Sequence, residues 1–223
     1  IIVNLRIIKL KYLMDFNYFL AHIYKIKELP LGGLDSQFKL APELRKQFSK
    51  KDIESQNPKE SAVLALFYPD IDQNTNILLM LRASYNGVHS AQISFPGGKK
   101  DKNDTNLEFT ALRETEEEIG ISKNRITIVR ELTKTYIPPS NFWVTPYIGV
   151  YNSTPTFSIN HEVEKLIEVP IIELLDENLL RTKNVTTSYM KNVDVPYFKL
   201  NNYTVWGATA MMLSEIKDLL KSL

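Results

Sequence analysis

The sequence has no cysteine among its 223 residues. A chain without cysteine can form no disulfide bond, no thiolate metal site and no cysteine nucleophile. The absence leaves the cellular compartment open, because it fits reducing and oxidising surroundings alike.

An excess of charge of one sign and long apolar runs are also missing. The 27 Lys and Arg residues nearly balance the 26 Asp and Glu residues, so bulk electrostatics give no reason to expect a nucleic-acid partner. The apolar start of the chain, residues 1–13, is interrupted by Arg6, Lys9 and Lys11 well before the roughly 20 residues that a membrane-spanning helix needs. It also lacks a signal-peptide cleavage site. We therefore predict no membrane partner, and the lack of targeting signals favours the cytoplasm.

What the chain does have is the composition of a globular protein, with 43% hydrophobic and 24% charged residues. Residues 1–59 predict an N-terminal helical extension, with an amphipathic helix over 15–27 and a lysine-rich helix over 42–51. Residues 60–223 form the main domain. A natural start at Met14, with residues 1–13 upstream of it, is one interpretation, and a start further upstream is the other.

The main domain alternates between strand and helix patterns. Short apolar runs at 61–68 and 77–82, separated by a Pro-Asp turn, predict a β-hairpin buried on both faces between helices. Further strands are predicted over 125–135, 142–151 and 162–170, with a short helix over 171–175 and a final helix that carries Met211 to Leu220. The pattern predicts an α/β fold.

The most informative stretch runs from Phe95 to Ile121 and ends in a predicted helix over 106–119. Thr105 and Glu108 have the spacing of a capping box, and Gly120 suits the end of the helix. Three residues at helical spacing form the expected buried stripe: Leu112, Thr115 and Ile119.

Four carboxylates occupy five consecutive positions of this helix, 114–118. Three of them lie on one face at spacing i, i+3 and i+4: Glu114, Glu117 and Glu118. Arg113 can pair with only part of this charge, whereas a bound divalent cation would compensate it. Oxygen ligands without cysteine or a nearby histidine favour Mg²⁺ or Mn²⁺. A solvated acidic helix face is the alternative.

The stretch resembles the Nudix box, which reads Gly, five residues, Glu, seven residues, then Arg-Glu-U-x-Glu-Glu-x-Gly-U, where U is aliphatic. The second half matches at Arg113, Glu114, Glu117, Glu118, Gly120 and Ile121. Asp104 replaces the first Glu, Thr115 replaces an aliphatic residue, and the gap before Arg113 is one residue longer. The longer gap and the Gly-Gly-Lys-x-Asp start resemble the coenzyme A diphosphatase subgroup.

A second signature of that subgroup is similar to residues 82–98. The matching positions are Arg82, His89, Gln92, Phe95, Pro96, Gly97 and Gly98. Gly87 stands where the subgroup has a basic residue. The Trp-Gly-Ala-Thr-Ala run at 206–210 also resembles the subgroup, and we assign it to packing of the last helix.

The resemblance implies a Nudix α/β/α sandwich with a mixed β-sheet, in which residues 60–223 are the hydrolase domain. It implies hydrolysis of a diphosphate bond, with coenzyme A giving phosphopantetheine and adenosine 3′,5′-bisphosphate. The implied metal ligands are Glu114, Glu118, Glu117 and the Gly98 carbonyl, and Arg113 orients the glutamates. The implied substrate contacts are Arg82, His89, Gln92, Ser140 and Asn141.

Several alternatives stay open from the sequence. The substrate could instead be a nucleotide sugar, ADP-ribose or a dinucleotide, or the chain could be a non-catalytic nucleotide-binding module. The general base is either Glu114 or a loop carboxylate. The expected partner is a small-molecule nucleotide diphosphate, and the formation of a homodimer is left open.

Overall fold

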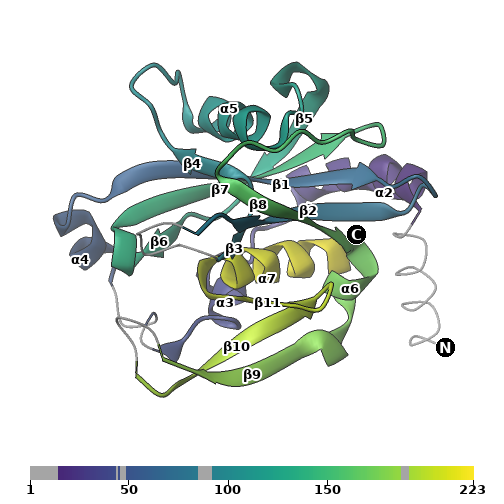
Figure 1. Cartoon of the computed structure of the whole chain (residues 1–223). Helices are drawn as coiled ribbons and strands as arrows, with labels where there is room; N and C mark the ends of the chain where they lie inside the picture. Colours follow the sequence, from purple (N-terminus) through teal and green to yellow (C-terminus); the bar gives the residue numbers. More distant parts are fainter. Residues whose placement is uncertain (1–14, 44, 46–48, 85–91, 187–190) are drawn as a thin grey trace.

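The computed structural model describes residues 15–43, 45, 49–84, 92–186 and 191–223 (Figure 1). Residues 1–14, with the alternative start at Met14, and His89 lie outside the described part. Within that part, no helix is both long enough and apolar enough to cross a membrane.

An eight-stranded sheet forms the centre of the described structure. Its strands are β1 (Lys59–Pro69), β2 (Thr75–Arg82), β3 (Ile93–Ser94), β4 (Gly97–Lys99), β5 (Ile126–Glu131), β6 (Thr135–Ile137), β7 (Phe142–Tyr151) and β8 (Val163–Pro170). The main path runs β3-β2-β1-β7-β5, and β4, β6 and β8 pair with β1, β7 and β2. The β1–β7 pair is parallel and the others are antiparallel, so the predicted mixed sheet is confirmed.

A second, three-stranded sheet lies below the first in Figure 1, with α7 between the two. It consists of β9 (Leu180–Val185), β10 (Val193–Leu200) and β11 (Tyr203–Trp206). The helices are α2 (Phe16–Ile23), α3 (Gly33–Phe38), α4 (Lys50–Ser55), α5 (Leu107–Ile119), α6 (Ile171–Leu175) and α7 (Gly207–Lys221). Short 3₁₀ turns are η1 (Tyr24–Glu28), η3 (Lys123–Arg125), η4 (Pro138–Ser140) and η5 (Glu177–Leu179).

Both faces of the main sheet are buried, as the apolar runs predict. Along β1, alternate side chains enter two different hydrophobic cores, because successive residues of a strand point to opposite faces. The core beside α5 takes Ala62, Leu64, Leu66 and Tyr68. The larger core, which contains residues of α2 and α7, takes Ala65 and Phe67. Helices thus lie above and below the sheet, and the predicted three-layer sandwich is confirmed (Figure 1).

The predicted hairpin is confirmed by the antiparallel pairing of β1 with β2, which includes Phe67 with Ile77. The N-terminal prediction is only partly right. The helix over 15–27 appears as α2 and η1, and the Asp15 side chain accepts a hydrogen bond from the Tyr18 N–H at 2.8 Å.

The helix predicted over 42–51 falls partly on residues 44 and 46–48, which lie outside the described part. Among the described residues of that range only 50 and 51 are α-helical, and the helices nearest to it are α3 and α4. The later helix, α4, begins after Ser49, whose side chain forms a capping box with Asp52. Such a box satisfies amide groups that no helical carbonyl can reach, and it sets the start of the helix. The earlier helix, α3, begins at Gly33, whose N–H donates to the buried Glu215 side chain at 3.1 Å.

Candidate active site

The helix that carries the carboxylates, α5, begins at a different cap from the predicted one. The Asn106 side chain accepts a hydrogen bond from the Phe109 N–H at 2.7 Å, and Asn106 itself has an extended backbone. The capping box predicted for Thr105 and Glu108 is therefore wrong, because the N-cap residue is Asn106, one position later. Gly120 ends the helix with φ of +76°, a left-handed conformation that glycine adopts without steric cost, as predicted.

The buried side of α5 includes a carboxylate, Glu118, which the predicted apolar stripe did not contain. Thr115 and Ile119 are buried as predicted, and the Thr115 hydroxyl donates to the Ala111 carbonyl at 2.7 Å. Leu112, however, is only half buried, whereas Glu118 lies on the buried side with 2% of its surface exposed. A buried carboxylate is costly unless it is compensated, so Glu118 is the most informative residue of the helix.

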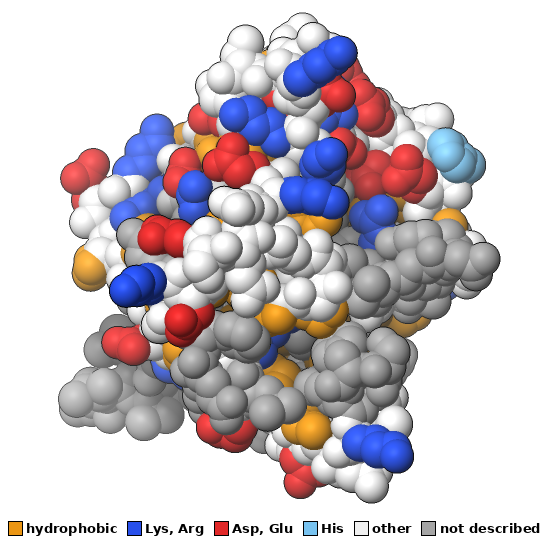
Figure 2. All heavy atoms as spheres, turned by 90° about the vertical axis from the view of Figure 1, so that its left-hand side faces the viewer, with side chains coloured by type: hydrophobic (Ala, Val, Ile, Leu, Met, Phe, Trp, Pro, Cys, Tyr) orange, Lys and Arg blue, Asp and Glu red, His pale blue; other side chains and the backbone are white. Residues whose placement is uncertain are grey.

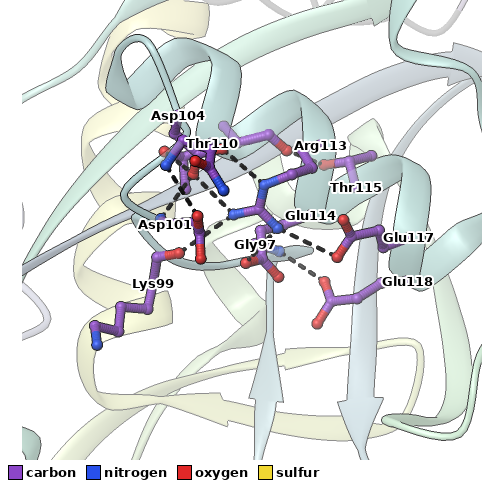
Figure 3. Close-up of polar contacts among 12 residues, drawn as sticks. Gly97, Lys99, Asp101, Asp104, Thr110, Arg113, Glu114, Thr115, Glu117 and Glu118 are labelled. Carbon is purple, nitrogen blue, oxygen red and sulfur yellow. Dashed lines mark hydrogen bonds and ion pairs between the residues drawn. The ribbon is translucent and has the colours of Figure 1, made fainter.

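Arg113 joins the acidic side chains of α5 to the preceding loop (Figure 3). Its guanidinium group binds Asp104 through two contacts of 2.8 Å, a bidentate arrangement. It also lies 2.9 Å from Glu114 and 3.2 Å from Glu117. The hydrogen bonds from Arg113 hold the pKa of Asp104 well below its usual range. Arg113 is thus placed to orient the carboxylates.

The Glu118 carboxylate contacts the backbone of β4 at Gly97, which with Gly98 forms the glycine pair of this strand. It accepts a hydrogen bond from the Gly97 N–H at 2.7 Å and lies 3.5 Å from the Arg82 guanidinium group. Burial raises the pKa of Glu118 to about 8, and the Gly97 bond and the positive charge of Arg82 oppose this shift. The negative charges of Glu114 and Glu162 raise the pKa further.

Glu114 lies against the other glycine, Gly98. A Cβ atom at Gly98 would lie 2.4–2.7 Å from the atoms of the Glu114 carboxylate, so only glycine leaves room for this side chain. Burial raises the pKa of Glu114, and the contact with Arg113 opposes the shift. The two carboxylates on α5 and the β4 backbone therefore meet at the glycine pair.

Glu117 is the most exposed of the three predicted metal ligands, with 56% of its side chain accessible. Within the described residues, no three acidic or histidine side chains are gathered closely enough to form a ready metal site. Glu114 and Glu117 instead contact Arg113. The donor chemistry nevertheless fits Mg²⁺ or Mn²⁺, because the available ligands are oxygen atoms and Glu118 is a buried acid that a divalent cation would stabilise in its charged form.

A cavity of about 820 Å³ opens beside the glycine pair. Of the predicted contacts, Arg82, Gln92, Gly98, Glu114 and Ser140 line it. Two of its polar atoms, Arg82 Nε and Ser94 Oγ, are buried without a hydrogen-bond partner among the described residues. Buried polar groups are usually paired, so these two atoms are exceptions in the described part, and neither is exposed in this structure.

Asn141 is not among the residues that line the cavity. Its side chain donates to the Gln56 carbonyl at 2.9 Å and accepts from the Tyr136 hydroxyl at 3.0 Å. Its φ of +53° is a conformation that asparagine tolerates in turns. The described contacts of Asn141 therefore belong to the turn before β7.

Other residues line the cavity that the sequence did not single out as site residues. Glu162 lies 3.6 Å from Arg82 and precedes β8 directly. The junction of β11 and α7 contributes Thr204, Trp206, Gly207, Ala208, Thr209 and Met212. We had assigned this junction to packing alone, although its Trp-Gly-Ala-Thr-Ala run was a signal for a site role.

Comparison with known proteins gives the following similarities. Residues 58–188, more than half of the chain, match the family described as NUDIX domain. Nudix hydrolase 22, chloroplastic, of Arabidopsis thaliana is 30% identical over 70% of this chain and 53% of its own length. The peroxisomal coenzyme A diphosphatase ndx-8 of Caenorhabditis elegans is 28% identical over 77% of this chain and 74% of its own. The Nudix hydrolase NudL of Yersinia pestis is 30% identical over 63% of this chain and 70% of its own length. The chain thus spans about half the length of the plant relative.

Proposed function

The chain belongs to the NUDIX domain family, and from that premise we propose that it is a metal-dependent enzyme that hydrolyses a diphosphate bond. The observation that carries the proposal is the buried carboxylate of Glu118, which lies close to Glu114 at Gly97 and Gly98 of β4. A solvated acidic helix face would leave this side chain in water, where it needs no counter-charge.

We propose coenzyme A or one of its derivatives as the substrate, cleaved to phosphopantetheine and adenosine 3′,5′-bisphosphate. Support comes from the subgroup signatures around the cavity and from the similarity to the nematode coenzyme A diphosphatase. A cytoplasmic location stays a prediction, since two of these relatives carry peroxisomal and chloroplastic names.

In this proposal the chain's own residues have distinct tasks. Glu114, Glu118 and the Gly98 carbonyl hold the metal ion, and Glu117 adds a ligand or a water-mediated contact. When bound, the ion would neutralise negative charge on the phosphate groups and lower the pKa of a water molecule. Arg113 is a positioning residue that orients Glu114 and Glu117 through its contacts of 2.9 and 3.2 Å.

The substrate contacts are assigned to the polar wall of the cavity. Arg82, Gln92 and Ser140 face it, and arginine suits a diphosphate because its planar guanidinium can bind two oxygen atoms at once. The general base is a carboxylate that faces the same space, either Glu114 or the loop residue Glu162. Both carboxylates are within electrostatic reach of Glu118.

A substitution of Glu118 tests the proposal. The Glu118→Gln enzyme should lose at least about 100-fold in metal-dependent kcat while keeping its fold, since an amide binds Mg²⁺ or Mn²⁺ poorly and cannot carry the charge. Glu116→Gln is the matched control on the same helix, because Glu116 pairs with Lys123 at 2.5 Å and should leave kcat within about twofold. Full activity of Glu118→Gln would overturn the metal-site assignment.

A substrate panel tests the substrate class. With Mn²⁺ or Mg²⁺ present, coenzyme A and its oxidised and acylated forms should be hydrolysed faster than ADP-ribose and NADH. Faster hydrolysis of ADP-ribose or NADH would show that the enzyme belongs to another Nudix substrate class. Binding without turnover of any compound would identify a non-catalytic module.

A further inference from the structure

The cavity extends from one side of the main sheet to the other. Glu114 reaches it from α5, which lies above the sheet in Figure 1, and Ala208 and Met212 reach it from α7, which lies below. The β4 residues Gly97 and Gly98 also line the cavity, and the Glu114 carboxylate fills the space beside Gly98. A ligand that fills the cavity is therefore extended and touches both layers.

The part of the cavity below the sheet, which we call the apolar arm, is walled by hydrophobic side chains. It comprises Val63, Ile93, Phe95, Ile137, Phe142, Val144, Ala208 and Met212. Phe95, Val144 and Met212 belong to the larger hydrophobic core, and the others pack against it. The arm is thus an unfilled edge of that core, where an apolar ligand group would remove further apolar surface from water.

Charged side chains are concentrated toward the other end. Arg82, Lys99, Glu114 and Glu162 line the cavity around the glycine pair. Arg45 is the other charged residue among the described lining, and it donates to the Tyr136 carbonyl at 2.7 Å. Figure 2 shows acidic and basic side chains interspersed over the upper part of one face, apolar side chains mainly across its middle, and further charged side chains at its lower edge.

This arrangement fits a ligand with a charged centre and an apolar tail. Building on the proposed function, we infer that the apolar arm binds the acyl chain of a coenzyme A thioester, and that Ala208 and Met212 set the chain length it accepts. The adenosine 3′-phosphate half of the substrate fits this place less well, because a phosphate needs cationic partners. Among the described lining, Arg45 is the cation on this side, and its guanidinium group donates to the Tyr136 carbonyl.

The chain-length dependence of kcat/KM tests this inference. For coenzyme A, acetyl-, butyryl-, hexanoyl- and octanoyl-coenzyme A, kcat/KM should rise by up to about fourfold per methylene group until the arm is full. In Ala208→Leu the larger side chain occupies the arm, so kcat/KM for the octanoyl ester should fall at least about tenfold more than kcat/KM for coenzyme A. Ala208→Ser, of similar size, should keep the chain-length dependence.

The outcomes separate this inference from the function on which it depends. If all coenzyme A compounds are hydrolysed with equal kcat/KM, or if folded Ala208→Leu keeps the wild-type dependence, the acyl-chain assignment is wrong and the diphosphatase proposal stands. If ADP-ribose is hydrolysed and no coenzyme A compound is, the proposed substrate class fails first.

A binding measurement without turnover gives an independent readout. The chain has two tryptophans, and only Trp206 lines this cavity, so Trp143→Phe leaves one reporter beside the arm. In buffer containing EDTA, octanoyl-coenzyme A should change the Trp206 emission and bind at least about tenfold more tightly than coenzyme A. Equal affinity for the two compounds, or no change in emission, would contradict the assignment.

Discussion

Burial raises the pKa of Glu118, and the free energy of unfolding should therefore depend on pH even without substrate. Burial raises its pKa from 4.5 to about 8, so the folded protein binds this proton more tightly than the unfolded chain does. The stabilising effect is complete below pH 4.5 and is lost as the pH rises toward 8. A difference of this size corresponds to about 5 kcal/mol as an upper limit.

We therefore expect the metal-free protein to lose stability as the pH rises from 4.5 to about 8, and Glu118→Gln to remove most of that loss. Urea unfolding in EDTA at several pH values measures it. Glu116→Gln is the control, because the hydrogen bond from Lys123 lowers the pKa of Glu116 and its contribution is lost only toward acid. An unchanged pH profile in Glu118→Gln would show that this carboxylate is not desolvated.

Arg113 depends on guanidinium geometry and not on charge alone. Its two contacts with the nearly buried Asp104 need two parallel N–H groups, which lysine cannot offer. Arg113→Lys should lower the free energy of unfolding by about 1–3 kcal/mol and reduce kcat, because Asp104 loses bonds and Glu114 loses its partner. Arg125→Lys is the control, since Arg125 lies over the Tyr151 ring, 4.8 Å from its centre. Equal effects of the two substitutions in thermal unfolding would contradict the assignment.

At the scale of elements, the approach of α5 to β4 depends on the missing side chain at Gly98. In Gly98→Ala the new methyl group would overlap the Glu114 carboxylate and displace it, so we expect at least about a tenfold loss of kcat. Gly33→Ala is the control away from the site, with a φ of +61° and open space around the new Cβ. It should cost about 1–2 kcal/mol in stability without changing kcat. Normal kinetics in Gly98→Ala would show that Glu114 has no fixed place in the site.

Elements with strong local signals could be predicted from the sequence. The bounds of β7 and α6 are as predicted, because continuous apolar residues define the strand and Pro170 precedes the helix. β9 was missed because most of its side chains are exposed and show no apolar alternation. The cap of α5 was misplaced because Thr105 and Asn106 are both good capping residues, and only the backbone conformation distinguishes them.

The site was predictable where one helix carries it and less so where distant segments meet. Glu114, Glu117 and Glu118 share a helix, so their common neighbourhood follows from helical spacing. The burial of Glu118 depends on how β4, with Gly97, packs against α5, and the cavity wall at Trp206 and Ala208 depends on how α7 packs below the sheet. Small residues suit close packing and an open cavity equally well, and only their place in the fold decides between the two.

At the scale of the whole molecule, a buried polar network joins the N-terminal helices to the rest of the described structure. The Gln37 amide on α3 donates to the Thr133 carbonyl at 2.8 Å and to Glu215 on α7 at 3.0 Å. Its oxygen accepts from the Thr135 hydroxyl at 2.9 Å. Gln37 and Glu215 are fully buried, and α2 contributes Phe16, Phe19 and Ile23 to the larger core. We propose that residues 15–59 and 60–223 unfold as one cooperative unit.

Gln37→Met tests this proposal, because it keeps the approximate shape of the side chain and removes every hydrogen bond that the side chain makes. Glu215 would remain buried with fewer donors, so we expect a loss of about 2–4 kcal/mol in the free energy of unfolding. Tryptophan emission and far-ultraviolet circular dichroism should still report one shared transition. Gln56→Met, at an exposed glutamine, is the control and should change stability by less than about 0.5 kcal/mol. Two separate transitions in the wild-type protein would instead make the N-terminal helices an independent unit, and the cavity wall at Pro42 and Arg45 would then be able to detach from the site.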